Sequence, residues 1–214
     1  MLRCIQRKAV AIKFIKTDKS DTRKRLKNEI HFCESVDHPN IIKIIDRGYI
    51  ELQDEAYPFY VMPLYDCSLR KKMKEGIEPA TSLSIIMSVL NGISFAHQSG
   101  IIHRDIKPEN ILLDDNMNPV ICDFGIAHFS DEALIASIET RVGDRLANFV
   151  YAAPEQRNKS KEITPAADLY AIGLIINELY TNQVPQASDY AKITDFSEDY
   201  GFLDSCRKAF QAES

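Results

Sequence analysis

Apolar and polar residues alternate near the start of the chain, and shorter apolar runs follow later. Residues 8–16 (KAVAIKFIK) alternate and are rich in β-branched side chains, a pattern typical of a half-buried strand. Two later runs, IIKII at 41–45 and YPFYVMPL at 57–64, also predict strands. Two apolar runs around a polar turn at 111–125 (ILLDDNMNPVICDFG) predict a β-hairpin.

Helices are predicted in four other segments. Residues 26–33 carry apolar side chains at helical spacing, and Pro39 ends this segment because proline disfavours the helical conformation at the preceding residue. Later segments predict a short helix at 68–76, a longer one at 80–99, and a helix at 164–180 that is apolar on nearly every face. The chain therefore divides into a small strand-rich part and a larger, mainly helical part.

Composition describes an ordinary globular protein that is large enough for a sizeable core. Of the 214 residues, 45% are hydrophobic and 27% are charged, and the formal net charge of −5 argues against a nucleic-acid surface. No apolar run approaches the roughly 18 residues that a membrane helix needs, so no membrane contact is expected. Five scattered cysteines without a CxxC pair favour a cytoplasmic location over a disulfide framework.

Four charged residues stand where the pattern points inward. Lys13 interrupts a strand, Glu29 and Asp168 lie on apolar helix faces, and Asp123 directly follows an apolar run. Inward charges are costly unless they are paired or bind a metal, so each of them needs a partner. Lys13 and Glu29 are natural partners, and a lysine held in place by a glutamate can bind a phosphate.

The stretch IIHRDIKPEN at 101–110 concentrates further polar chemistry between apolar residues. Asn110 and Asp123 offer the oxygen ligands that Mg²⁺ prefers. Asp105 can accept a hydroxyl proton, and Lys107 can neutralise charge on a phosphoryl group. Positioning, charge neutralisation and one proton acceptor are the needs of phosphoryl transfer.

Six short motifs occur in one order between residue 8 and about residue 180. They are VAIK (10–13), HPNI (38–41) preceded by a helix glutamate, HRDIKPEN (103–110), DFG (123–125), APE (153–155) and DLYAIG (168–173). Taken singly, each motif residue has an ordinary structural reading, such as a solvated lysine or a core histidine. As an ordered set they make the chain resemble a eukaryotic-type (Hanks-type) serine/threonine protein kinase domain.

The resemblance implies an α+β fold of the bilobal protein-kinase type. A small, incomplete antiparallel-sheet lobe with one helix would span residues 1–62. A hinge at 63–67 would join it to a larger, mainly helical lobe at 68–214. The implied cofactors are ATP and Mg²⁺, and the implied partner is a protein substrate with a serine or threonine hydroxyl.

Site residues follow from the motifs by position. Asp105 would be the catalytic base, Lys107 the phosphate-stabilising lysine, and Asn110 a catalytic-loop residue that holds the metal together with Asp123. Met62 would be the gatekeeper, directly before the hinge. The cofactor-binding residues implied in this way are Lys13, Glu29, Ala11, Met62, Leu64, Leu112 and Asp123.

The resemblance also implies architectural roles. His103 is expected in the core against Phe124, and Asp168 is expected to bond the backbone around His103 and Arg104. Glu155 is expected in a structural salt bridge. An arginine before the base suggests an activation segment ordered by a phosphate. The candidate phosphosites are Ser130, Ser137 and Thr140.

Three departures from the family pattern lead to alternative interpretations. No GxGxxG or GxG occurs, the chain ends in an apparent helix where the family continues, and Asn148 stands where a threonine is usual. We therefore expect a domain truncated at both ends, without the glycine-rich loop and the last helices. The alternative function is a non-catalytic kinase-like scaffold or regulatory module. A small-molecule kinase is a third interpretation, and the APE motif speaks against it.

Overall fold

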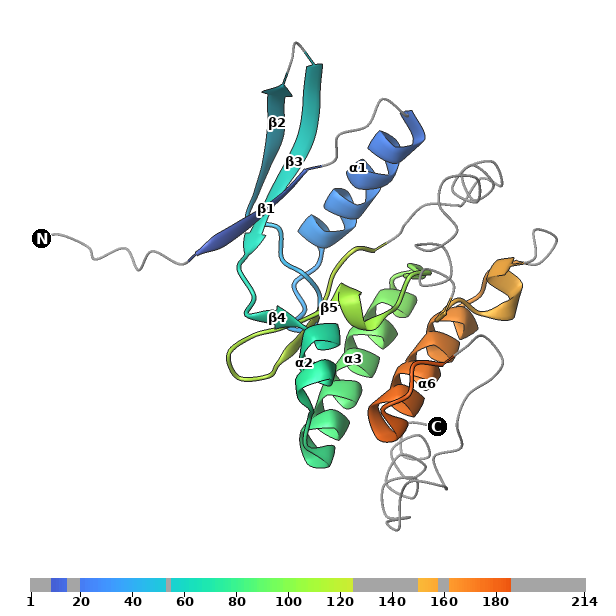
Figure 1. Cartoon of the computed structure of the whole chain (residues 1–214). Coiled ribbons are helices and arrows are strands. Elements are labelled where there is room, and N and C mark those ends of the chain that lie inside the picture. The colour runs from blue at the N-terminus through green and yellow to red at the C-terminus, as the bar shows by residue number, and fades with distance from the viewer. Residues whose placement is uncertain (1–8, 15–19, 53–54, 125–149, 158–161, 186–214) are drawn as a thin grey trace, which may run out of the picture.

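The structure is a computed structural model, and its elements are labelled in Figure 1. It describes residues 9–14, 20–52, 55–124, 150–157 and 162–185. The strands are β1 (Val10–Phe14), β2 (Asp46–Leu52), β3 (Glu55–Pro63), β4 (Cys67–Ser68), β5 (Ile111–Leu113) and β6 (Pro119–Ile121). The helices are α1 (Ser20–Ser35), α2 (Leu69–Glu75), α3 (Pro79–Gln98) and α6 (Ala166–Thr181), with short 3-10 helices η1 (Pro108–Asn110) and η2 (Pro154–Arg157).

A three-stranded antiparallel sheet in the order β1-β3-β2 forms the small part of the molecule, with α1 beside it (Figure 1). Its register places Ala11 opposite Met62 and Lys13 opposite Tyr60. The predicted apolar face of α1 is buried at Leu26, as it is at Ile30 and Cys33. The sheet and helix together confirm the strands predicted at 8–16 and 57–64 and the helix that follows the first of them.

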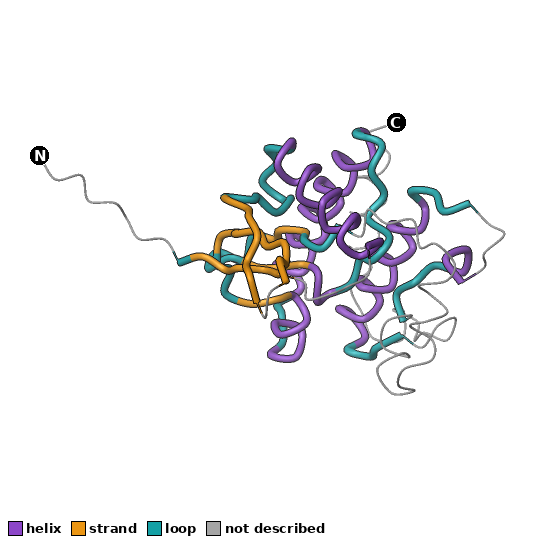
Figure 2. Tube along the Cα trace, turned by 90° about the horizontal axis from the view of Figure 1, so that it is seen from above, coloured by secondary structure: helices purple, strands orange, loops and turns teal. Residues whose placement is uncertain are grey.

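Helices dominate the larger part. The inner face of α3 is buried, and α3 contacts both β6 and α6, which runs alongside it in Figure 1. At Gly92 an added Cβ would lie 3.0 Å from the Ile121 side chain and 3.1 Å from Asn40, so glycine permits this close approach of helix and strand. Seen from above in Figure 2, the strands gather at one end and most helices at the other. The predicted α+β class is confirmed.

The predicted hairpin is present as a second antiparallel sheet, β4-β5-β6, in the larger part. Ile111 pairs with Ile121 in its register. The predicted short helix ends at Gly76, which adopts a φ of 93° that favours glycine.

The strand predicted at 41–45 is wrong. Ile41 makes one isolated parallel bridge to Ile121, and the segment then changes partner. The Ile42 N–H donates to the Ile121 carbonyl at 2.9 Å, whereas the Ile45 N–H donates to the Val61 carbonyl at 2.8 Å. A strand needs continuous pairing with one neighbour, and this apolar segment instead links the two sheets.

Two smaller expectations also need correction. The last described helix begins at Ala166, not at the predicted residue 164, and Pro165 is the residue directly before it. No segment was expected to be long and apolar enough to span a membrane, whereas α3 has the length and composition of a spanning helix. Its buried residues, such as Ile86 and Ile93, face the protein core, as in a core helix of a folded domain.

Several predictions fall on parts of the chain that the structure does not describe. The sequence between DFG and APE predicts a long loop at 126–150, and these residues lie outside the described part of the chain apart from Val150. The same holds for Asn148 and for the candidate phosphosites. The division at residues 62 and 68 into two lobes and a hinge stays a prediction.

Candidate active site

Asp168 of α6 organises the stretch that contains the predicted base. Its carboxylate is only 1% exposed. It accepts hydrogen bonds from the backbone N–H groups of His103 at 2.8 Å and Arg104 at 2.7 Å, and it contacts His97 Nε2 at 2.8 Å. Burial acts to raise the pKa of Asp168, but the hydrogen bonds from His97 and the backbone lower it overall. These contacts confirm the predicted architectural role of Asp168.

These bonds hold the backbone of Arg104 in an unusual conformation. Its φ of 69° lies in the left-handed region, which a non-glycine residue rarely adopts. The bond to Asp168 holds the backbone in this conformation from one side. Gln156 of η2 holds it from another, because its Nε2 donates to the Arg104 carbonyl at 2.6 Å while its Oε1 accepts from the Ala153 N–H at 2.9 Å.

His103 is the core residue that was predicted. It is fully buried, and its ring centroid lies 4.6 Å from that of Phe124. Burial lowers the pKa of His103, so the imidazole is neutral. Its Nδ1 accepts the Asp105 N–H at 3.3 Å, which leaves Nε2 to donate to the Cys122 carbonyl at 3.0 Å. His103 therefore joins the segments that carry Asp105 and Asp123.

The three predicted catalytic residues meet around one carboxylate oxygen. Lys107 Nζ lies 2.9 Å from Asp105 Oδ2, and Asn110 Nδ2 donates to the same oxygen at 3.0 Å. Asn110 Nδ2 also donates to the Asp105 carbonyl at 2.8 Å. Both side-chain contacts use Oδ2, and the Asp105 side chain is 39% exposed. A half-exposed carboxylate held in this way can accept a proton from a group that approaches from solvent.

Lys13 lies between two carboxylates. Its Nζ is 3.6 Å from Glu29 Oε1 and is also ion-paired with Asp123 Oδ1. Glu29 is buried and accepts a hydrogen bond from the Tyr60 hydroxyl at 3.0 Å. Burial acts to lower the pKa of Lys13, but the two carboxylates raise it overall, so the ammonium stays charged. The predicted pair with Glu29 is confirmed, and the contact with Asp123 is an addition.

The groups at Asn110 and Asp123 fit a magnesium ion. The Cys122 N–H donates to the Asn110 carbonyl at 2.9 Å, so the two predicted ligands lie on paired segments. Asn110 is buried and its Nδ2 is committed to Asp105, which makes its amide oxygen the atom for a cation. One carboxylate and one amide oxygen, completed by phosphate and water, suit Mg²⁺. Within the described ranges no three His, Cys, Asp or Glu side chains gather into another candidate metal site.

The residues expected near the adenine come from both sheets and from the segment after β3. Ala11 and Met62 are half-buried and paired across β1 and β3. Leu64 follows β3 and is exposed, and its N–H donates to the Ala9 carbonyl at 3.1 Å. Leu112 is half-buried in β5, opposite Ser68 of β4.

Two further residues belong to this site although no sequence motif predicts them. Gln156 supports Arg104, but its position directly after APE was its only signal. Tyr60 bonds Glu29, and its place opposite Lys13 appears only in the sheet register. Glu155 makes no ion pair among the residues that the structure describes, so its predicted salt bridge stays a prediction.

Comparison with known proteins identifies the family. A family model described as the protein kinase domain matches residues 2–208. Serine/threonine-protein kinase PrkC of Bacillus subtilis (strain 168) is 33% identical over 181 residues, which cover 82% of this chain and 27% of PrkC. Serine/threonine-protein kinase PknL of Mycobacterium tuberculosis (strain ATCC 25618 / H37Rv) is 31% identical over 170 residues, which cover 78% of this chain and 40% of PknL. The leucine-rich repeat receptor protein kinase EMS1 of Arabidopsis thaliana is 31% identical over 191 residues, which cover 86% of this chain and 15% of EMS1. The chain thus spans less than half the length of these relatives.

Proposed function

The chain belongs to the protein kinase domain family, and we propose that it transfers the γ-phosphoryl group of ATP to a serine or threonine hydroxyl of a protein. The observation that carries the proposal is the meeting of Lys107 and Asn110 at Asp105 Oδ2, on a segment fixed to the one that bears Asp123. The names of PrkC and PknL as serine/threonine-protein kinases support the hydroxyl acceptor.

In this proposal Asp105 accepts the proton of the substrate hydroxyl as that oxygen attacks the γ-phosphorus. The bond between this phosphorus and the bridging oxygen breaks, and ADP leaves with the bonding electron pair. Lys107, already 2.9 Å from Asp105 Oδ2, is placed to neutralise negative charge on the transferred group. Asn110 keeps the Asp105 carboxylate oriented through its amide N–H.

Lys13 would bind the phosphates from the side of the small sheet. Glu29 is the partner that holds its ammonium there, and Tyr60 in turn fixes Glu29. Asn110 and Asp123 would hold Mg²⁺. When bound, this ion supplies positive charge that stabilises the phosphates during transfer. Ala11 and Met62 would line the adenine site at the edge of the sheet.

The test is a transfer assay with γ-labelled ATP, Mg²⁺ and a general protein substrate. Asp105→Asn keeps the hydrogen bond to Asn110 but removes the proton acceptor. We expect its turnover to fall by roughly 10²–10⁴-fold, the contribution of a general base. Equal incorporation of label by the parent and the variant would refute the role of Asp105.

A kinase-like module without catalysis is the alternative. No contact among the described residues favours it, and the same assay separates the two functions. A parent chain that transfers no phosphoryl group to any acceptor, although it is folded and binds nucleotide, would favour the module.

A further inference from the structure

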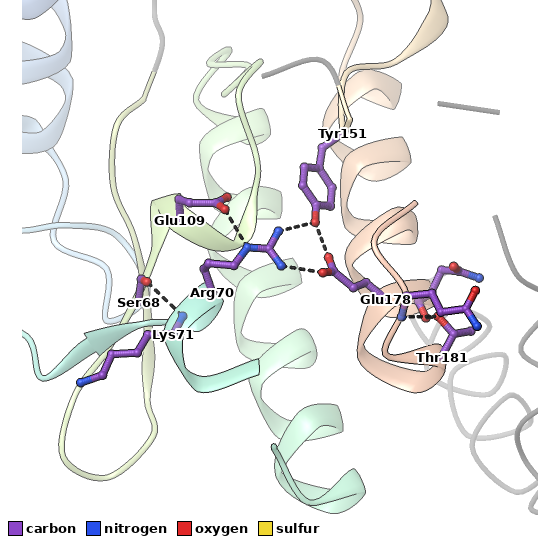
Figure 3. A network of polar contacts seen from close by, with 9 residues as sticks. Ser68, Arg70, Lys71, Glu109, Tyr151, Glu178 and Thr181 are labelled. Atoms are coloured by element: carbon purple, nitrogen blue, oxygen red, sulfur yellow. Dashed lines mark hydrogen bonds and ion pairs between the residues drawn. The ribbon is translucent and has the colours of Figure 1, made fainter. Parts of the chain in front are cut away.

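Arg70 of α2 connects three separate segments of the larger lobe (Figure 3). Its Nε lies 2.7 Å from Glu109 Oε1, its Nη1 lies 2.5 Å from Glu178 Oε1, and its Nη2 donates to the Tyr151 hydroxyl. Tyr151 in turn donates to Glu178 Oε2. Glu109 lies in η1, Glu178 in α6, and Tyr151 two residues before the APE motif.

The cluster has a buried arm, which is the contact of Arg70 with Glu178, and an exposed arm, which is its contact with Glu109. The Glu178 side chain is 6% exposed, whereas that of Glu109 is 46% exposed. A buried carboxylate needs a charged or hydrogen-bonded partner, and Arg70 together with Tyr151 supplies both. The link to Glu178 therefore stabilises the lobe. The link to Glu109 lies at its surface, where an ion pair adds little to the free energy of unfolding.

Only arginine can make this set of contacts. A guanidinium offers donors on three nitrogens in one rigid plane, and here each nitrogen serves a different segment. The same guanidinium lies 5.8 Å from the centre of the Tyr151 ring. A lysine would keep the charge but present a single nitrogen, so it could not hold all three partners at once.

Glu109 is the residue directly before Asn110, which hydrogen-bonds the proposed base Asp105. It precedes Asn110 in η1, and Asn110 Nδ2 bonds both the Oδ2 and the carbonyl of Asp105. Asp168 and Gln156 hold this loop near Arg104, several residues earlier. At the later end of the loop, Arg70 forms an ion pair with Glu109 and so contacts η1.

We propose that Arg70 is a positioning residue. Through Glu109 it fixes η1 so that the amide nitrogen of Asn110 faces Asp105 and its amide oxygen faces the Mg²⁺ site. Through Tyr151 it ties the segment before APE to the same loop. This inference rests on the proposed function, because it gives Asn110 its role toward Mg²⁺. It predicts that the exposed arm matters for cation binding and the buried arm for stability.

The test separates the two arms in the full 214-residue chain. Mg²⁺ is titrated in the presence of a fluorescent ATP analogue, and the half-saturating Mg²⁺ concentration is read from nucleotide binding. We expect Glu109→Gln and Arg70→Met to raise this concentration roughly tenfold, the low end of the effect of residues that orient metal ligands. Arg70→Lys should fall between these variants and the parent. Thermal unfolding is measured on the same samples, and only Arg70→Met should lower Tm clearly.

The matched control is the ion pair of Arg47 and Glu34, 2.9 Å apart on the small lobe. Arg47→Met removes an arginine–glutamate pair elsewhere and should leave the Mg²⁺ midpoint unchanged. Parent-like midpoints in Glu109→Gln and Arg70→Met, with Mg²⁺-dependent binding intact in the parent, would overturn the inference alone. A folded parent without Mg²⁺-dependent nucleotide binding would overturn the proposed function and the inference with it.

Discussion

The two charged centres of the site are built differently. Around Asp168 in the larger part of the molecule, a buried carboxylate accepts hydrogen bonds from backbone N–H groups and contacts a histidine nitrogen. Around Lys13 at the small sheet, side-chain charges neutralise one another, and the Lys13 side chain is 26% exposed. The first centre is anchored to the main chain, whereas the second depends on side chains from β1, α1 and the segment after β6.

This difference assigns different tasks to the two centres. Asp168 bonds the two backbone N–H groups directly before Asp105, so this centre restrains the main chain that carries the predicted base. An ammonium between two carboxylates can exchange one partner for a phosphate at little cost in geometry. We therefore propose that the Asp168 centre preorganises the loop that bears Asp105 and that the Lys13 centre binds the nucleotide.

The largest expected effect is that of Asp168→Ala on stability. The change leaves the backbone N–H groups of His103 and Arg104, together with His97, without their acceptor. At roughly 1–3 kcal/mol for each unsatisfied group, we expect the free energy of unfolding to fall by about 3–5 kcal/mol. Urea unfolding followed by circular dichroism measures it. The control, Asp37→Ala, removes an exposed ion pair with Lys43 and should cost less than about 1 kcal/mol. Similar losses in both variants would erase the distinction between the centres.

The next effect is a pH dependence of stability from His103. Burial lowers its pKa in the folded chain below the ordinary value of 6.5. Below pH 6.5 the unfolded chain therefore binds a proton that the folded chain does not, and the free energy of unfolding decreases as the pH falls. Replacing His103 with Leu should reduce this slope by up to about 1.4 kcal/mol per pH unit. An unchanged slope between pH 7 and 5 would show that His103 is not held neutral.

A smaller effect on stability is expected at the Lys13 centre. Glu29→Gln keeps an acceptor for the Tyr60 hydroxyl but removes the charge that holds Lys13. We expect the dissociation constant for an ATP analogue to rise roughly tenfold, or about 1.4 kcal/mol. The free energy of unfolding should change much less than in Asp168→Ala. Glu34→Gln on the same helix is the control. A large loss of stability with unchanged binding would reverse the tasks of the two centres.

The sequence was most informative where chemistry and periodicity coincide. Asp168 was predicted to bond the backbone near His103 because a motif and an apolar helix face both pointed to it. The face of α1 was predicted from Leu26, Ile30 and Cys33 in the same way. In these cases the local pattern contains the reason for the structure, because a charge on a buried face must find a partner.

Other features depend on contacts that no local pattern contains. The contact of Lys13 with Asp123 joins residues 110 positions apart. Arg70 stands in the short helix predicted at 68–76, yet its partner Glu178 lies 108 positions away. The run at 41–45 was misread as a strand because burial alone does not distinguish a strand from a linker between two sheets.

The most direct test of the central claim pairs two readings on one variant, Asp105→Asn. Binding of an ATP analogue in the presence of Mg²⁺ is measured by calorimetry, and phosphoryl transfer is measured on the same preparation. The division of tasks predicts parent-like nucleotide affinity together with a roughly 10²–10⁴-fold loss of transfer. Transfer at the parent rate would contradict it, and so would a loss of transfer explained entirely by lost nucleotide binding.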